Sequence, residues 1–134
     1  MDVNRKRAAR PHTGPVVRYP LRIIAHLLVG LPSMADGGID YDAADPKILE
    51  VLREELATLI GVANSGVSAI GHLLALAAPE VEGGEVPGDT IEGLGWLLTL
   101  LGDTAGWATE MKLRCDQANA DYSPPELSRE SRHA

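Results

Sequence analysis

The stretch DPKILEVLREELATLIGVANSGVSAIGHLLALAAP, residues 45–79, decides the fold of this chain. Asp45 can cap the start of a helix, and Pro46 suits the first helical position because the N–H it lacks would have no partner there. Apolar or small residues then recur at steps of three and four: Leu49, Leu52, Leu56, Leu59, Ala63, Gly66, Ile70, Leu73 and Ala77. This spacing predicts a long amphipathic helix over residues 46–78 that packs along one face.

The same pattern predicts a second helix over residues 89–118. Pro79 ends the first helix, and residues 80–88 form a connection rich in glycine and acid. The seam then repeats at Leu94, Leu97, Leu101, Thr104, Ala108, Met111, Cys115 and Ala118. Each helix is roughly 50 Å long at about 1.5 Å per residue. Two helices of similar length joined by a short loop predict an antiparallel hairpin.

The two seams can be compared by folding the chain about residues 83 and 84. Most facing pairs then combine a large residue with a small one, as in Gly66–Leu101, Leu59–Ala108 and Leu52–Cys115. Such pairs allow two helices to pack closely. Near the loop the pairs are large against large: Leu73–Leu94 and Ile70–Leu97. We therefore expect the helices to diverge there and to admit a third element, for which residues 21–31 are the candidate.

The fold class predicted is all-α: a long antiparallel helical hairpin with coiled-coil-like packing, plus a short N-terminal helix over residues 20–31. Residues 21–31 also have the outline of a secretory signal, but Arg22 and His26 interrupt the apolar run, and the helix is preferred. A hairpin is too thin to bury the apolar residues that flank its seams: Ile60, Val67, Leu74, Leu98, Leu100 and Ala105. We expect dimerisation to complete a bundle. The helical domain then spans residues 20–118, between a basic flexible arm, 1–19, and a flexible tail, 119–134.

The net charge of -7 hides two segments of opposite charge. Residues 1–35 hold six basic residues and one acid, whereas residues 36–134 hold six basic residues and eighteen acids, which gives +5 and -12. An acidic body repels phosphate. Nucleic acid could therefore be contacted only through the arm, by Arg5, Lys6, Arg7, Arg10 and Arg18.

Two sets of residues on the second helix are candidates for binding a partner. Trp96 and Trp107 lie at the border of the seam, beside the acids Asp103 and Glu110, and tryptophan is enriched at interface hot spots. A strip of glycines, Gly95, Gly102 and Gly106, lies nearly opposite the leucine seam. Each interior glycine costs about 1 kcal/mol relative to alanine, so three on one strip suggest a close approach of another backbone.

The composition argues against several classes of protein. One Cys makes neither a disulfide framework nor a cysteine-based zinc site, and the four His lie in separate segments without ligand spacing. No uninterrupted apolar run reaches the roughly 18 residues expected of a membrane span. We find no catalytic constellation, metal site, cofactor motif or small-molecule substrate site. We therefore expect a cytoplasmic protein that is not an enzyme and does not enter a membrane.

The sequence leaves two functions open. The first is a small helical interaction protein, such as a bacterial inhibitor, adaptor or accessory protein, that binds a protein partner or itself through the hairpin. The second is a nucleic-acid-associated regulator, in which a helical dimer presents two basic arms to phosphate.

Overall fold

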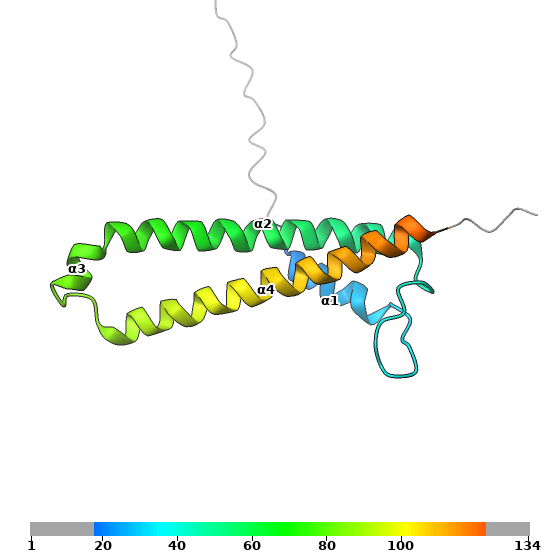
Figure 1. Ribbon diagram of the computed structural model, residues 1–134, viewed down its shortest axis with the longest axis horizontal. Coiled ribbons are helices and arrows are strands. Elements are labelled where there is room, and N and C mark those ends of the chain that lie inside the picture. The colour runs from blue at the N-terminus through cyan, green and yellow to red at the C-terminus, as the bar shows by residue number, and fades with distance from the viewer. Residues whose placement is uncertain (1–17, 123–134) are drawn as a thin grey trace, which may run out of the picture.

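The computed structural model describes residues 18–122 of the 134-residue chain, and this part is helical. Its elements are α1 (Pro20–Val29), α2 (Pro46–Leu76), α3 (Ala78–Glu82) and α4 (Gly88–Asp121). Within the described range, the only β-type pairing is a single bridge between Ser33 and Ile39. Helices α2 and α4 run antiparallel along the length of the molecule, and α3 joins them at one end (Figure 1). We call the α3 end the tip and the opposite end the open end.

The start of α2 follows from its capping residues. The Asp45 carboxylate accepts a hydrogen bond of 2.8 Å from the backbone N–H of Lys47, and Pro46 occupies the first turn. The helix ends at Leu76 and not at residue 78, because Pro79 lies in the first turn of the separate short helix α3. Gly84, with φ of 76°, then adopts the left-handed conformation that lets the chain turn toward α4.

The other helices also differ at their ends from the sequence prediction. Helix α1 ends at Val29, two residues before the predicted end, although Leu31 is still buried in the core. Helix α4 begins at Gly88 and continues to Asp121, so the first residues assigned to a flexible tail are helical. Residues 1–17 and 123–134, which hold most of the predicted arm and tail, lie outside the described part.

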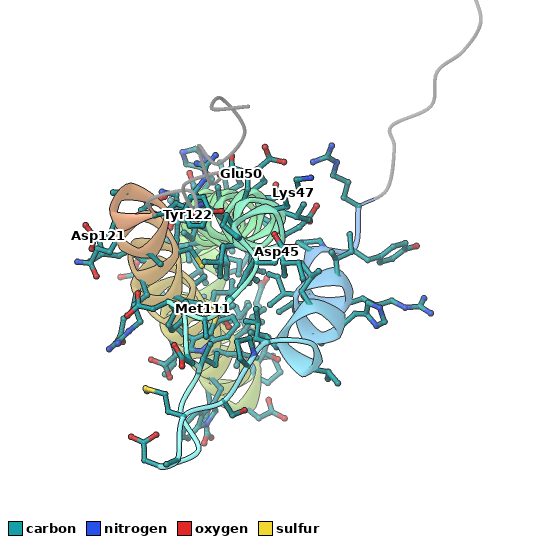
Figure 2. The ribbon with its side chains drawn as sticks, turned by 90° about the vertical axis from the view of Figure 1, so that its right-hand side faces the viewer. Asp45, Lys47, Glu50, Met111, Asp121 and Tyr122 are labelled. Atoms are coloured by element: carbon teal, nitrogen blue, oxygen red, sulfur yellow. The ribbon has the colours of Figure 1, made fainter. Side chains whose placement is uncertain are left out.

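The hydrophobic core lies entirely in the open half of the hairpin. It consists of Leu49, Leu52, Leu56 and Leu59 from α2, Ala108, Met111 and Cys115 from α4, Ile24 from α1, and Leu31 and Ala44 from the connecting segment. Figure 2 looks onto this end and shows α1 and α4 on two different sides of α2. Three helices and the 30–45 segment therefore enclose the core here, as burial of long apolar stripes requires.

Toward the tip, α2 and α4 diverge, as the large-against-large pairs predicted (Figure 1). A Cβ atom placed on Gly66 would lie 3.5 Å from Leu101 Cδ1, so the helices are still in contact at that level. The prediction that residues 21–31 fill the gap near the loop is wrong. Helix α1 packs instead on the first half of α2, at the open end.

The connecting segment explains this position of α1. Hydrogen bonds from Met34 N to Gly38 O and from Asp40 N to Pro32 O fold residues 32–40 back on themselves. Tyr41 and Ile39 then pack against the core. A connection folded this way keeps α1 near the start of α2, where the apolar face of α1 meets Leu49 and its neighbours in the core.

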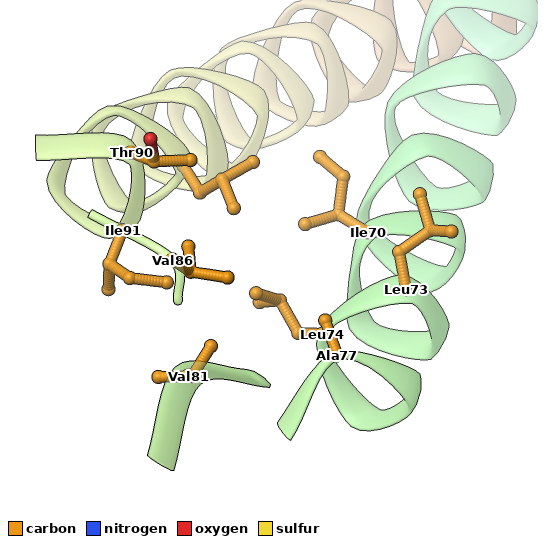
Figure 3. A pocket seen from close by; sticks show the side chains of 9 residues that line it. Ile70, Leu73, Leu74, Ala77, Val81, Val86, Thr90 and Ile91 are labelled. Carbon is orange, nitrogen blue, oxygen red and sulfur yellow. The ribbon is translucent and has the colours of Figure 1, made fainter. Parts of the chain in front are cut away.

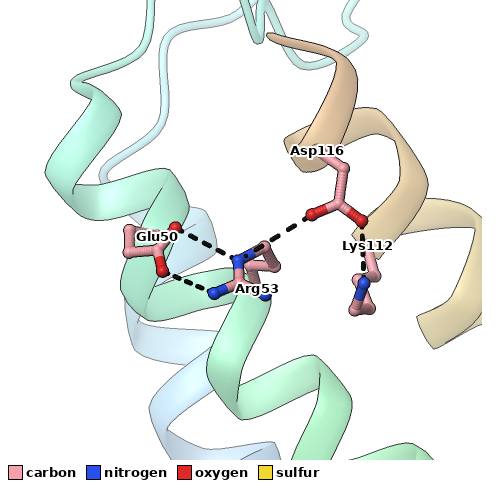
Figure 4. A network of polar contacts seen from close by, with 4 residues as sticks. All are labelled: Glu50, Arg53, Lys112 and Asp116. Carbon is pink, nitrogen blue, oxygen red and sulfur yellow. Dashed lines mark hydrogen bonds and ion pairs between the residues drawn. The ribbon is translucent and has the colours of Figure 1, made fainter. Parts of the chain in front are cut away.

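A network of charged side chains joins α2 to α4 at the open end (Figure 4). Arg53 of α2 pairs with Glu50 on its own helix and lies 3.8 Å from Asp116 of α4, which also accepts a 2.7 Å bond from Lys112. The hydrogen bond from Arg53 lowers the pKa of the Glu50 carboxyl. These side chains are partly exposed, so the network fixes the pairing of the helices more than it adds stability.

Candidate interaction surface

The tip half of the hairpin contains no buried residue. Between Ala63 and Ala108, every residue is exposed or only partly buried, although this range includes the second half of α2 and the first half of α4. Helices in water gain most of their stability from packing of an apolar face. The tip half therefore has helical structure whose apolar surface is not covered by other parts of residues 18–122.

Six large exposed apolar residues lie in this half or at its border, three on each helix. They are Val62, Leu73 and Leu76 of α2 with Trp96, Leu100 and Trp107 of α4, and we call them the uncovered face. Their exposed fractions range from 41% for Trp107 to 77% for Leu76. On each helix the three residues lie within about 60° of one another at 100° per residue.

The uncovered face continues the side of the hairpin that α1 covers. Ile48 of α2 and Met111 of α4 pack in the core that includes Ile24 of α1. Leu73 lies within about 20° of Ile48 around α2, and Trp107 lies one turn before Met111 on α4. On α2, this side is therefore covered by α1 at the open half and left uncovered by residues 18–122 at the tip half, which gives this side a step.

The two tryptophans predicted to bind a partner lie on this face. Trp96 is 68% exposed, and Trp107, which lies further along α4 toward the open end, is 41% exposed. Asp103 and Glu110 are exposed on the same helix, and Glu110 forms a 3.0 Å ion pair with Arg114. The structure thus groups the tryptophans with Leu100, whose 61% exposure makes it a further member of the surface.

The predicted glycine strip lies elsewhere on α4. Gly95, Gly102 and Gly106 are about 100° around the helix from the tryptophans. A Cβ atom added to any of the three would meet no atom within 4 Å. The strip and the tryptophans therefore do not form one surface, and within residues 18–122 no other segment approaches the glycines.

The basic residues proposed for nucleic acid fall mostly outside the described range, which includes only Arg18 of the five. Arg18 is exposed, next to Tyr19, the residue that precedes α1. Arg5, Lys6, Arg7 and Arg10 lie within residues 1–17, which the structure does not describe.

The tip also holds an apolar hollow that the sequence patterns did not predict. It has a volume of about 260 Å³ between α2, α3 and α4 (Figure 3). Its lining is apolar except for Thr90: Ile70, Leu73, Leu74, Ala77, Val81, Val86, Ile91 and Leu94. Small-molecule sites usually add a few polar groups that fix orientation. The hollow is better described as the space that the large seam residues leave unfilled where the two helices diverge.

The sequence feature that could have indicated this surface is the distribution of charged residues along the chain. Residues 56–79 contain no Asp, Glu, Lys or Arg, and residues 54–111 contain no Lys or Arg at all. The acids of the tip half are Glu80, Glu82, Glu85, Asp89, Glu92 and Asp103. The tip is therefore both apolar and negatively charged, whereas the lysines and arginines of α2 and α4 lie at the open end.

Helix α2 is long and apolar enough to cross a membrane by length and composition alone, with a mean hydropathy of 1.6 in its most apolar window. The sequence reading missed this because it required an uninterrupted apolar run, and Asn64, Ser65, Ser68 and His72 interrupt this one. Only 11% of that window is buried in the structure. The low burial of this window is thus a second observation that the apolar surface of α2 is largely uncovered.

Neither a metal site nor a known relative assigns a role to this surface. Across residues 18–122, no three His, Cys, Asp or Glu side chains come together in an arrangement that could hold a metal ion. No protein-family model matches the sequence, and comparison with curated proteins and with solved structures found no match.

Proposed function

We propose that this protein is a small non-catalytic helical interaction protein, and that it binds another protein chain through the uncovered face. The observation that carries this proposal is the absence of any buried residue between Ala63 and Ala108, in a stretch that holds two long amphipathic helices. A partner that covers the face supplies the packing that these helices lack.

The size of the surface supports this proposal. If a fully exposed aromatic side chain presents roughly 150–250 Å², Trp96 and Trp107 alone expose on the order of 200 Å², and four aliphatic side chains that are each more than half exposed add to this area. Exposed apolar patches of several hundred Å² mark interaction surfaces.

The acids of the tip favour a protein over a membrane as the partner. Glu80, Glu82, Glu85, Asp89 and Glu92 lie between the apolar parts of α2 and α4. Insertion of the hairpin tip first would require these carboxylates to pass through the bilayer, where an ionised group near the centre costs roughly 3 kcal/mol. A helix that lies on an anionic membrane instead needs lysine and arginine on its polar face, and residues 54–111 contain neither.

The nucleic-acid regulator remains the alternative function. It rests on the +5 charge of residues 1–35 and would use the basic arm, because the acidic hairpin repels phosphate. Its contacts would be dependent on salt and largely independent of base sequence. Removal of residues 2–18 separates the two functions, since it leaves the uncovered face in place.

The proposal is tested by comparing two leucines on the same helix. Leu100 lies on the uncovered face and Leu113 does not, yet their exposed fractions are 61% and 56%. Tagged wild type, Leu100→Ser and Leu113→Ser would be used to capture proteins from host lysate, and to capture an untagged copy of the chain, with and without nuclease. We expect at least a tenfold loss of captured protein for Leu100→Ser alone, unaffected by nuclease.

The result that would contradict this function is equal capture by both variants, or capture that nuclease abolishes. Circular dichroism of each variant controls for loss of helix. Because both leucines are exposed, their replacement removes little packing within one chain, and the helix signal should be retained.

A further inference from the structure

We propose that the occupant of the uncovered face is a second copy of this chain, packed antiparallel to the first, with α1 of each copy lying on the uncovered face of the other. This inference rests on the proposed function and names its partner. It is carried by three features of the structure: the step on one side of the hairpin, the exposed apolar residues of α1, and the separation of charge along the molecule.

The step gives the two copies complementary shapes. Helix α1 begins near the middle of α2 and runs toward the open end, and beyond its start the same side of the hairpin is bare (Figure 1). When a second copy is turned end to end about a two-fold axis, its α1 comes to the bare half of the first copy. The two α1 helices then lie one after the other between the two hairpins, and the arrangement closes as a dimer.

Helix α1 has an apolar surface that its own hairpin leaves exposed. Ile24 faces the core, whereas Val29 of α1 and Tyr19, which precedes α1, are 88% and 63% exposed. At about 100° per residue both lie on the half of the helix that points away from Ile24, beside Arg22 and His26. The outer side of α1 therefore combines exposed apolar side chains with Arg22 and His26. In the antiparallel dimer the inner side of α1 contacts its own hairpin and the outer side contacts the uncovered face of the second copy.

The charges favour this pairing over one that joins two tips. Helix α1 contains Arg22 and no acid, and Arg18 precedes it. The tip half contains six acids and neither Lys nor Arg. Antiparallel packing places the cationic helix against the acidic half, whereas two tips in contact would bring like charges together.

The first measurement is the self-association of the full chain. Sedimentation over a concentration series should show a monomer–dimer equilibrium for the wild type. Trp96→Ser should raise the dissociation constant at least tenfold, and Leu113→Ser should leave it within a factor of two. Higher salt should weaken the dimer, because the pairing joins opposite charges. A wild type that stays monomeric at all concentrations would overturn the inference.

The second measurement fixes the orientation by cross-linking two exposed alanines. Ala25→Cys places a thiol on an exposed flank of α1, and Ala69→Cys places one beside the uncovered face. A mixture of the two variants treated with a short bismaleimide should give a cross-linked dimer, and Ala69→Cys alone should give none. Wild type is the control for Cys115, which is buried. Cross-linking of Ala69→Cys to itself would show tips in contact and would overturn the antiparallel arrangement.

These results separate the inference from the proposed function. A monomeric wild type whose Leu100→Ser variant still loses a captured protein would overturn the second copy as occupant and keep the function. Flotation of the protein with vesicles of phosphatidylcholine and phosphatidylserine provides a third arm. Binding to vesicles by the wild type, lost in Trp96→Ser, would overturn both, because the face would then contact lipid.

Discussion

Cys115 is the residue at which burial has its clearest chemical effect. Its side chain is fully buried in the core between α2 and α4, close to Leu52 in the predicted pairing of the seams. Burial disfavours the charged thiolate and raises the pKa of the thiol from 9.0 to about 11. The nearby carboxylate of Asp116 acts in the same direction, whereas Arg53 and Lys112 act against it. A thiol in this environment is unreactive at neutral pH.

This pKa predicts a loss of stability in alkali. The unfolded chain releases the thiol proton near pH 9 and the folded chain near pH 11, so between these values the unfolded state binds fewer protons. The free energy of unfolding should therefore fall by up to about 2–3 kcal/mol as the pH rises through this window. Urea titrations of wild type and Cys115→Ala would measure it. The free energy of unfolding of the variant should depend less steeply on pH. Part of the dependence should remain, because burial also raises the pKa of Tyr41.

Gly102 shows the opposite case, a residue with free space around it. A Cβ atom there would meet nothing within 4 Å, and the residue lies inside α4. Gly102→Ala should raise the free energy of unfolding by about 0.5–1 kcal/mol, because alanine loses less backbone entropy in a helix. Gly61→Ala on α2, which is equally open, should behave alike in the same denaturant titration. A tenfold weaker self-association of Gly102→Ala would instead show that the glycine strip is a contact.

At the scale of an element, α2 consists of two halves with different surroundings. Its first half supplies Leu49, Leu52, Leu56 and Leu59 to the core, and its second half, after Ala63, has no buried residue. Local opening of a helix requires less free energy where few apolar side chains are buried. The two halves should therefore differ in stability, although they form one continuous helix.

Hydrogen exchange should resolve the two halves of α2. In dilute protein, amides of residues 52–60 should exchange at least tenfold more slowly than those of residues 66–75, because only the first segment lies over the core. Mass spectrometry of peptides from the folded chain measures both segments in one sample. Repetition at high protein concentration should slow the second segment if a partner copy covers it. Equal protection of both segments in dilute protein would contradict the description of the tip half as uncovered.

The elements also show what the sequence could and could not predict. The seam spacing from Leu49 to Ala77 was sufficient to predict α2 and its packing against α4, since steps of three and four depend only on helix geometry. The position of α1 was not predictable, because hydrogen bonds of residues 32–40 hold it at the open end. Pro79 was read as the end of one helix, whereas it also starts α3. Local sequence patterns therefore predict each helix well, but they predict poorly where a helix such as α1 packs on the others.

At the scale of the whole molecule, the hairpin has a packed half at the open end and a diverging half at the tip. The sequence analysis named the tryptophan pair Trp96 and Trp107 and the glycine strip as two candidate sets on α4, and helix geometry alone does not show which of the two sides remains apolar and exposed on α2 as well. Leu73 and Leu76 were missed, since the spacing assigned Leu73 to the seam. Only the divergence of the helices leaves such residues open to a partner, and divergence is a property of the assembled hairpin.

The run without lysine or arginine has a consequence for how this protein is digested. Trypsin cleaves after these two residues, and the chain offers none from Glu54 to Met111. The half of the hairpin with the least packing is thus inaccessible to trypsin by its chemistry and not by its stability. A protease that cleaves after glutamate would instead find Glu80, Glu82 and Glu85 exposed at the tip. Digestion with trypsin and digestion with the glutamate-specific protease should therefore lead to opposite conclusions about which half of the hairpin is accessible.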